Sequence, residues 1–412
     1  MLTPDMSARG TLRRAGSLEK EDGHMNIFNQ IVYMVGAVTT VLCIILCLAL
    51  FVACKSRDRN GKRIELDNHT SEAPWSLGVW IAGVFVAGTG VALMYAPGDL
   101  VGYVQQGLNP TESVTMVALL NGAPVWAMYS VMGLWYMRHM DSKIGKLAAM
   151  LSTVLGMSIS LWTGMNTVAR FIGLNFPGMK FMLAAITVMV AMISARYNLL
   201  KGMSRLAFLV FFFAFLAVLS TPLTDFKFSP ITGSITGAFW KEYFNGATAA
   251  SWIFWFLSWT PTVSRWLAHI SKGRTMREYI AGTMILPTVL AFVWMAVSWM
   301  YQDVIMSFNL AKNIASFIPC VIFIISGILF MTGTLDSDCK VFTEDLEFLT
   351  NGKLNHRATV PYYGLFVLFV FSLFISGIIR EPFAFNEYSS MIFMPLMVMS
   401  MIECVRIIRE QK

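Results

Sequence analysis

SWIFWFLSWTPTVSRWLAHISKGRTMRE, residues 251–278, is the stretch that decides how the rest of the chain is interpreted. Trp252, Trp255 and Trp259 follow one another at helical spacings of three and four, so they share one face of a helix. Pro261 then removes a backbone donor and strains a helix through that point. The basic run 265–277 comes next, and a bilayer core does not tolerate such a run. The stretch predicts a membrane helix that breaks near its middle and ends at a cytoplasmic surface.

The composition places the chain among integral membrane proteins. Of 412 residues, 56% are hydrophobic and 13% are charged, whereas soluble domains carry about 25% charged residues. The six cysteines lie in or beside apolar runs without metal-binding spacing, so neither a metal site nor a disulfide framework is expected. The net charge of +7 comes from residues between apolar runs, which is typical of orientation signals in a lipid bilayer rather than of nucleic-acid binding.

Apolar runs of helical length predict eleven membrane spans. We expect these at 26–54, 75–104, 112–138, 147–173, 179–197, 205–222, 246–268, 277–300, 313–335, 358–379 and 385–405. Lysines and arginines are concentrated in alternate loops. The opposite loops hold only Lys180, Lys227, Lys241, Lys312 and Arg380. The basic side faces the cytoplasm, which predicts a plasma-membrane protein with its C-terminus inside and its N-terminus outside.

The spans form two groups of five, and because five is odd the second group runs inverted relative to the first. Each group opens with an interrupted helix, at 88–90 with 97–98 in the first group and at Pro261 in the second. Such a pair indicates an inverted-repeat transporter with its site at the broken helices. The alternative is that these glycines and prolines only serve helix packing.

This arrangement predicts six regions in the chain. They are a polar N-terminal segment (1–25), an extra membrane helix with a basic cytoplasmic loop (26–74), a first five-helix repeat (75–222), an outer surface segment (223–245), a second five-helix repeat (246–405) and a short cytoplasmic tail (406–412).

The order of residues in the opening stretch resembles the signature of the betaine/choline/carnitine transporter family. The signature, roughly W-W-x-S-W-S-P-F-V-G and I-A-R-I-S-x-G-R-T-I-R-E-F, corresponds to residues 255–264 and 267–279. Residues 87–95 are similar to the family run A-G-M-G-x-G-L-M-F, residues 124–129 to H-P-W-x-x-Y, and residues 334–337 to T-S-A-D-S. The resemblance implies an all-α membrane fold, a leucine-transporter-like ten-helix core of two inverted five-helix repeats, preceded here by one extra helix instead of the usual two. It also implies a homotrimer.

The resemblance implies an aromatic box for a quaternary ammonium group. Its positions fall on Tyr95, Trp126, Tyr129, Trp255, Phe256 and Trp259. A methylated ammonium cannot donate a hydrogen bond, so it is held by π faces that converge from different helices. The alternative role of these rings is packing or an interfacial belt.

Two departures from the family pattern bear on the substrate. Asn121 stands where a box tryptophan is common, so we expect one more polar wall. Ala92 stands where choline-type members are expected to carry aspartate. A cation without its own carboxylate then lacks a nearby anion, which favours a zwitterion such as betaine.

The family's cation site implies sodium ligands, and no other cofactor is expected. The positions are carbonyls of Val86, Thr89 and Phe330 and the hydroxyl of Thr334, while Gly333 replaces a second hydroxyl. Loss of one oxygen matters to a hard cation. In sodium-independent relatives a basic side chain takes this place, and Lys201 or Arg205 is a candidate here. We expect no proton relay, because no acidic residue lies deep within a predicted span.

These features predict a secondary active transporter that takes up a quaternary-ammonium or related onium solute such as glycine betaine, coupled to sodium, by alternating access. The alternatives are a binding-only membrane sensor and a sodium-independent exchanger of carnitine- or betaine-type substrates. The chain shows no H-E-x-x-H, P-loop or G-x-S-x-G motif, so we do not expect an enzyme.

Overall fold

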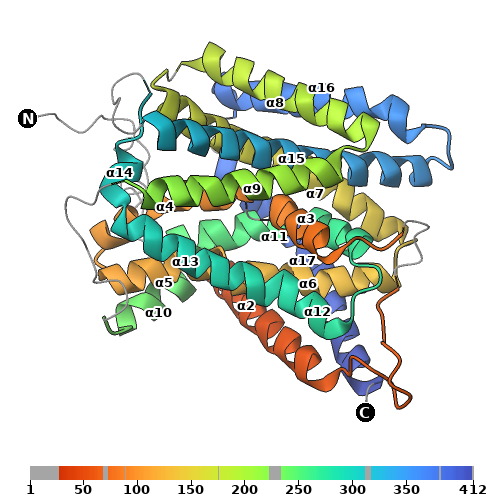
Figure 1. The fold of residues 1–412 in the computed structure, drawn as a ribbon. Helices are drawn as coiled ribbons and strands as arrows, with labels where there is room; N and C mark the ends of the chain where they lie inside the picture. The colour runs from red at the N-terminus through yellow and green to blue at the C-terminus, as the bar shows by residue number, and fades with distance from the viewer. Residues whose placement is uncertain are drawn as a thin grey trace, which may run out of the picture.

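The computed structural model describes residues 27–67, 73–88, 90–174, 176–221, 233–310, 317–379 and 382–410, with the side chains of 27–30, 90–95, 247 and 382–389 left aside. Within these ranges every regular element is a helix (Figure 1). The predicted N-terminal segment 1–25 and residues 223–232 of the surface segment lie outside the described residues.

The helices follow one another with short connections. They are α2 (Ile27–Ala53), α3 (Leu77–Gly88), α4 (Gly90–Gln105), α5 (Pro110–Leu120), α6 (Ala123–Arg138), α7 (Lys143–Ile172), α8 (Pro177–Tyr197), α9 (Leu200–Leu219), α10 (Gly237–Asn245), α11 (Ala247–Ile270), α12 (Met276–Ile280), the π-helical turn η2 (Ala281–Ile285), α13 (Leu286–Met300), α14 (Gln302–Met306), α15 (Phe317–Leu349), α16 (His356–Ile375) and α17 (Pro382–Glu410).

Nine helical stretches in the described part of the chain are long and apolar enough to cross a bilayer, so the protein is an all-α membrane protein. They are Ile31–Ala53, Pro110–Arg138, Lys143–Ile172, Pro177–Tyr197, Leu200–Leu219, Met276–Met300, Phe317–Leu349, His356–Ile375 and Ser390–Glu410. Two of the eleven expected spans are not among them. The first is covered by α3 and α4, of 12 and 16 residues, with Thr89 between them outside the described residues. The second is α11, which has 24 residues but is rich in serine and threonine. The division into inverted repeats remains a prediction.

The two helices α6 and α11 lie at the centre of the bundle. They pack along each other, and α7, α15 and α17 surround α11 (Figure 1). All side chains from Pro124 to Met137 are buried, as are those from Trp252 to Ser271. In contrast, α8, α9 and α16 expose large apolar side chains, for example Tyr362 and Leu365. A helix that meets protein on all sides can carry hydroxyl groups that a lipid-facing helix cannot, because neighbouring helices satisfy them.

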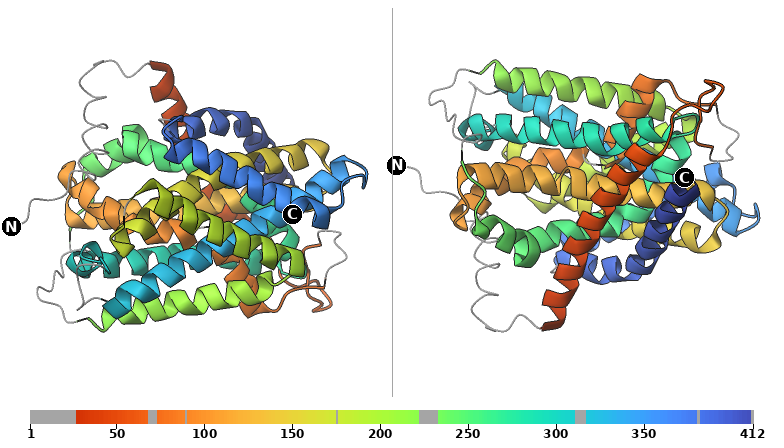
Figure 2. Two further views of the ribbon diagram at one scale, coloured as in Figure 1. Left: turned by 90° about the horizontal axis from the view of Figure 1, so that it is seen from above. Right: turned by 90° about the horizontal axis from the view of Figure 1, so that it is seen from below.

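The N-terminal helix α2 lies obliquely across one face of this bundle, which Figure 2 shows in the view from below. It packs on α6, α12 and α17. The Thr40 hydroxyl lies 2.8 Å from the hydroxyl of Tyr243 on α10, so α2 is also tied to the described end of the predicted surface segment.

The predicted break at Pro261 is wrong: α11 is continuous through this residue. The reason is a hydroxyl from α7. Ser152 donates to the carbonyl oxygen of Ser258 at 2.6 Å and accepts from the backbone N–H of Thr262 at 3.3 Å. It thus takes the place of a helical hydrogen bond beside the proline. Inserting a side chain into the hydrogen-bond ladder in this way satisfies the groups that the proline frees.

The interruption expected at 88–90 stays a prediction, because Thr89, between the end of α3 at Gly88 and the start of α4 at Gly90, lies outside the described residues. Pro97 is inside α4 rather than at a break. An interruption that we did not expect separates α5 from α6 at 121–122 within one span.

The helix α15 corrects the expectation that no acid lies deep within a span. It runs to Leu349, fourteen residues beyond the predicted end at 335, and buries Asp336, Asp338 and Asp345. Asp345 lies 3.0 Å from the guanidinium of Arg265 on α11 and 3.4 Å from the ammonium of Lys146 on α7. We call this group the three-helix clasp, because one carboxylate joins α7, α11 and α15.

Candidate functional site

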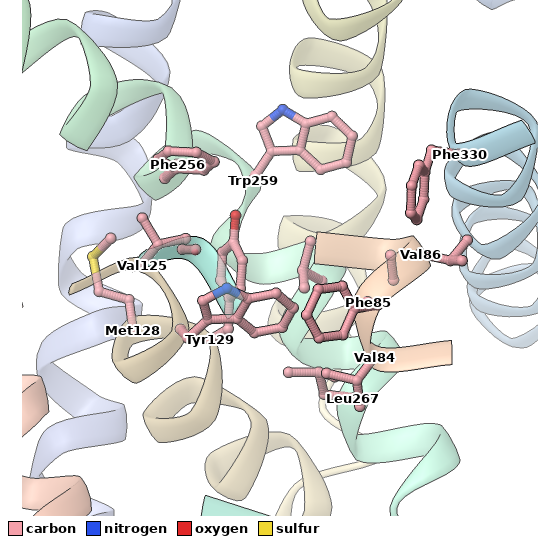
Figure 3. Close-up of a cluster of buried hydrophobic side chains, with 14 of the residues drawn as sticks. Val84, Phe85, Val86, Val125, Met128, Tyr129, Phe256, Trp259, Leu267 and Phe330 are labelled. Atoms are coloured by element: carbon pink, nitrogen blue, oxygen red, sulfur yellow. The ribbon is translucent and has the colours of Figure 1, made fainter. Parts of the chain in front are cut away.

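A narrow pocket lies between the two central helices and their neighbours. Its lining comes from five helices. The residues are Gly88 of α3, Tyr129 of α6, Ser160 of α7, Trp255, Phe256 and Trp259 of α11, and Thr334 of α15. Four of the seven are aromatic. Figure 3 shows Phe256 and Trp259 on one side of Tyr129, whose hydroxyl points toward them.

The helix α11 presents three aromatic side chains to the pocket. The rings of Trp255 and Phe256 are stacked, with centroids 5.4 Å apart and planes 16° apart. Trp252, one turn earlier, stacks on Phe256 at 5.4 Å but does not line the pocket. On α7, a Cβ atom at Gly156 would come within 2.7 Å of the Trp259 indole nitrogen, so the missing side chain gives the indole its place.

Tyr129 is the contribution of α6. Its side chain is fully buried, and its hydroxyl has no hydrogen-bond partner among the described residues. Trp126 meets it edge to face with centroids 5.6 Å apart. Trp126 also packs on the backbone of Gly88, where an added Cβ would lie 2.2 Å from the indole ring. Trp126 therefore supports the pocket wall from behind and does not line it.

The structure brings together four of the six predicted box aromatics: Tyr129, Trp255, Phe256 and Trp259. The side chains of Tyr95 and Ala92 lie outside the described residues. Asn121 is fully buried at the turn before α6, away from the lining, and its side-chain amide donates to the carbonyl of Val117 at 2.9 Å.

Sequence analysis missed Ser160 as part of the pocket wall, whereas Gly88 belongs to the 88–90 stretch at which the site was expected. A pattern pointed to Ser160: Ser152, Gly156 and Ser160 are small residues spaced by four on the face of α7 that meets α11. Small residues at this spacing let membrane helices approach closely.

The residues expected to hold sodium converge between α3 and α15. The hydroxyl oxygen of Thr334 lies 2.7 Å from the carbonyl oxygen of Val86 and 2.9 Å from that of Phe330. A Cβ at Gly333 would come within 2.2 Å of the Val86 side chain, so the valine occupies the space of the absent hydroxyl. The three oxygens suit a hard cation in type, although such ions take six or more ligands.

The basic side chains considered as a substitute for sodium lie elsewhere. The Lys201 ammonium sits 5.1 Å from the centre of the Trp75 ring, and the side chain of Arg205 is exposed. Neither lines the pocket.

Comparison with known proteins relates the chain to one group. No protein-family model matches it. Over 169 residues it is 30% identical to "Glycine betaine transporter 1" of Vibrio parahaemolyticus, covering 36% of this chain and 32% of that protein. Over 304 residues it is 26% identical to the "High-affinity choline transport protein" of Escherichia coli K12, covering 60% and 45%. A glycine betaine transporter of Acinetobacter baylyi is 26% identical over 308 residues, also covering 60% and 45%. The chain is similar in sequence to bacterial glycine betaine and choline transporters.

The similarity to these transporters covers only part of this chain and only part of each of the transporters. The chain spans about a third to a half of the length of the curated relatives that it matches. Within the chain, the stretch that resembles the transporter signature forms the central helix α11, and this helix supplies three of the pocket's aromatic side chains.

Proposed function

We propose that the chain is a secondary active transporter that takes up a quaternary-ammonium or related onium solute, such as glycine betaine, by alternating access. The observation that carries the proposal is the convergence of Tyr129, Trp255, Phe256 and Trp259 on one buried pocket. Each π face contributes roughly 0.5–2 kcal/mol to holding a desolvated cation. The relatives are named as transporters of glycine betaine or choline and not as enzymes, which supports the same class.

Polar groups at the pocket fit the other end of a zwitterion. The Tyr129 hydroxyl has no hydrogen-bond partner among the described residues, and Ser160 also lines the pocket. The interruption predicted at 88–90 would lie beside the pocket wall at Gly88, and helix ends favour charged groups of a substrate. A solute with both a methylated ammonium and a carboxylate therefore finds complementary groups here.

We further propose that sodium drives uptake, with Thr334 and the carbonyls of Val86, Thr89 and Phe330 as ligands. The hydrogen bonds from the Thr334 hydroxyl to the carbonyls of Val86 and Phe330 bring three of these oxygens together, which supports the site. Sodium-independent exchange is the second candidate, because Gly333 provides no hydroxyl and Val86 fills its space.

Transport by purified protein in liposomes tests these proposals. We expect uptake of labelled glycine betaine driven by an inward sodium gradient and abolished by replacing sodium with potassium. Equal uptake in both media would reject sodium coupling and favour the exchanger. Counterflow separates a transporter from a sensor, since a sensor binds the solute without exchanging it.

Orientation and assembly are also proposals. We propose a plasma-membrane protein with the C-terminus in the cytoplasm, the N-terminus outside and three copies per assembly. A cysteine introduced at Gln411 should be labelled only from the cytoplasmic side and one at Ser17 only from outside. Labelling of both from one side would contradict the odd number of spans.

A further inference from the structure

Asp338 on α15 is buried, and one oxygen of its carboxyl group lacks a hydrogen-bond partner. Its residue is 1% exposed, and Oδ2 meets no donor in the described part of the chain. The other two buried acids of this helix have charged or polar partners: Asp336 accepts a hydrogen bond from Ser194 of α8, and Asp345 holds the two cations of the three-helix clasp through Oδ1. An unpaired carboxylate in such surroundings is too costly to persist in charged form.

Asp338 lies close to the pocket. It follows Thr334, a pocket-lining residue, by four positions, so both lie on one face of α15 about 6 Å apart along its axis. The Thr334 hydroxyl turns to the carbonyls of Val86 and Phe330, not to the acid. The phenol of Tyr129 lines the pocket and also interacts electrostatically with Asp338.

Three titratable side chains interact electrostatically with Asp338, and none of them is a cation. They are Tyr129 of α6, Tyr363 of α16 and Cys339 of α15 itself. The hydroxyls of both tyrosines are buried without partners among the described residues. The cations of α7 and α11, Lys146 and Arg265, are bound to Asp345, which is two helical turns further along α15. On α8, Ser194 is turned to Asp336.

A proton fits this environment better than a metal ion. Hard metal ions need several oxygen ligands, and no cluster of three His, Cys, Asp or Glu that could hold a metal occurs in the described residues. A proton needs only the carboxylate, and it turns the acid into a donor for a neighbouring phenol oxygen.

We propose that Asp338 holds a proton while the pocket is empty and releases it to solvent when a methylated cation binds, so that the pocket exchanges one positive charge for another. The proton leaves the carboxylic acid, no other bond changes, and the carboxylate that remains is the counter-charge of the bound cation. This inference rests on the proposed function and widens the substrate class from zwitterions to cations. The ionised Asp338 would supply the negative charge that choline-type family members are expected to carry at the position of Ala92.

The exchange distinguishes two onium compounds. Choline carries a net positive charge and therefore favours ionised Asp338. Glycine betaine brings its own carboxylate, so little charge remains to be balanced and the proton stays. By reciprocity, raising the pH strengthens choline binding, because the proton and the cation compete. The affinity gain reaches at most about tenfold per pH unit, the limit for release of one proton.

Calorimetry on the purified full chain in detergent tests the proposal. Choline and glycine betaine are titrated, in the absence of sodium, in two buffers of different ionisation enthalpy at the same pH, which gives the number of protons released. We expect wild-type protein to release close to one proton with choline and almost none with betaine, with choline binding more tightly as pH rises. Asp338→Asn should bind choline with no release and no pH dependence, whereas the exposed control Asp141→Asn should behave as wild type.

The outcomes separate the two proposals. Choline binding without proton release, or release that persists in Asp338→Asn, would overturn the role of Asp338 and leave the transport proposal intact. Failure of both compounds to bind would overturn the proposed function itself. If Asp338→Asn does not fold, the wild-type proton count and its pH dependence still decide the question.

Discussion

Two helical stretches that we expected to be interrupted meet at the same pocket, and they have very different neighbours. Thr89, between α3 and α4, lies outside the described residues, whereas α11 passes through Pro261 without a break. At Gly88 the neighbour is a large rigid ring, Trp126, which needs the space of a side chain. At Pro261 the neighbour is a small hydroxyl, Ser152, which restores the hydrogen bonding. A glycine and a proline in the two stretches thus serve the pocket in different ways, one by giving space to a ring and the other with the help of a hydroxyl.

The largest effect is expected at Gly88. Gly88→Ala places a Cβ where three atoms of the Trp126 ring lie within 2.9 Å. Overpacking of this kind costs about 3 kcal/mol at the upper end of its usual range. We expect a clear fall in the thermal unfolding midpoint in detergent and loss of onium binding.

Gly78→Ala is the matched control for this change. It lies in the same helix with nothing within 4 Å of the added atom, and alanine is the better helix former. Its stability should be unchanged or slightly higher. Equal damage from both variants would mean that α3 tolerates no alanine at all, and that contact with Trp126 is not the cause.

A somewhat smaller loss of stability is expected when Ser152, the neighbour of α11 near Pro261, is replaced. Ser152→Ala removes the hydroxyl that serves the Ser258 carbonyl and the Thr262 amide, and leaving such buried groups unpaired costs about 2 kcal/mol. Thermal unfolding should show this loss. The exposed Ser376→Ala should show none.

The double variant sharpens the comparison further. In a Pro261→Ala background the helix regains its N–H donor, so the cost of Ser152→Ala should shrink. Strictly additive costs would show that Ser152 does not compensate for the proline.

The smallest effect concerns binding alone. Trp259→Leu keeps apolar bulk but removes a π face from the pocket, which should weaken glycine betaine binding by about 1–2 kcal/mol, roughly five- to thirtyfold. Trp252→Leu, whose ring stacks behind the pocket, should matter less. Calorimetric titration measures both. The reverse order would place the substrate on another face of α11.

What the sequence predicted well depended on local pattern and on family resemblance. Helical periodicity placed Trp255 and Trp259 on one face, and the resemblance added Tyr129 from another helix; the structure brings all three to one pocket. The supporting role of Trp126 was not predictable in this way, because its contact with Gly88 joins two helices distant in sequence.

Two wrong predictions, the break at Pro261 and the end of the α15 span at residue 335, had a common physical cause. The continuity of α11 depends on Ser152, and the length of α15 depends on neighbours that cover its acids. Hydropathy falls at Asp336 and Asp338, which suggested a helix end, but both carboxyl groups face protein and not lipid. Hydropathy measures how well a segment is accommodated in lipid, and it does not indicate which helices are enclosed by other helices.

The three-helix clasp restricts how this chain can change over generations. Loss of Asp345 alone leaves Lys146 and Arg265 as two buried charges of the same sign, and breaking such a buried group typically costs about 3–5 kcal/mol. Loss of Arg265 alone is milder, since Lys146 still neutralises the carboxylate and also rests 4.0 Å from the Phe348 ring centre. The substitutions therefore have a preferred order: Arg265 can be replaced first, and Asp345 only after that. Among divergent copies of this chain, those that lack the aspartate should also lack at least one of its two cations.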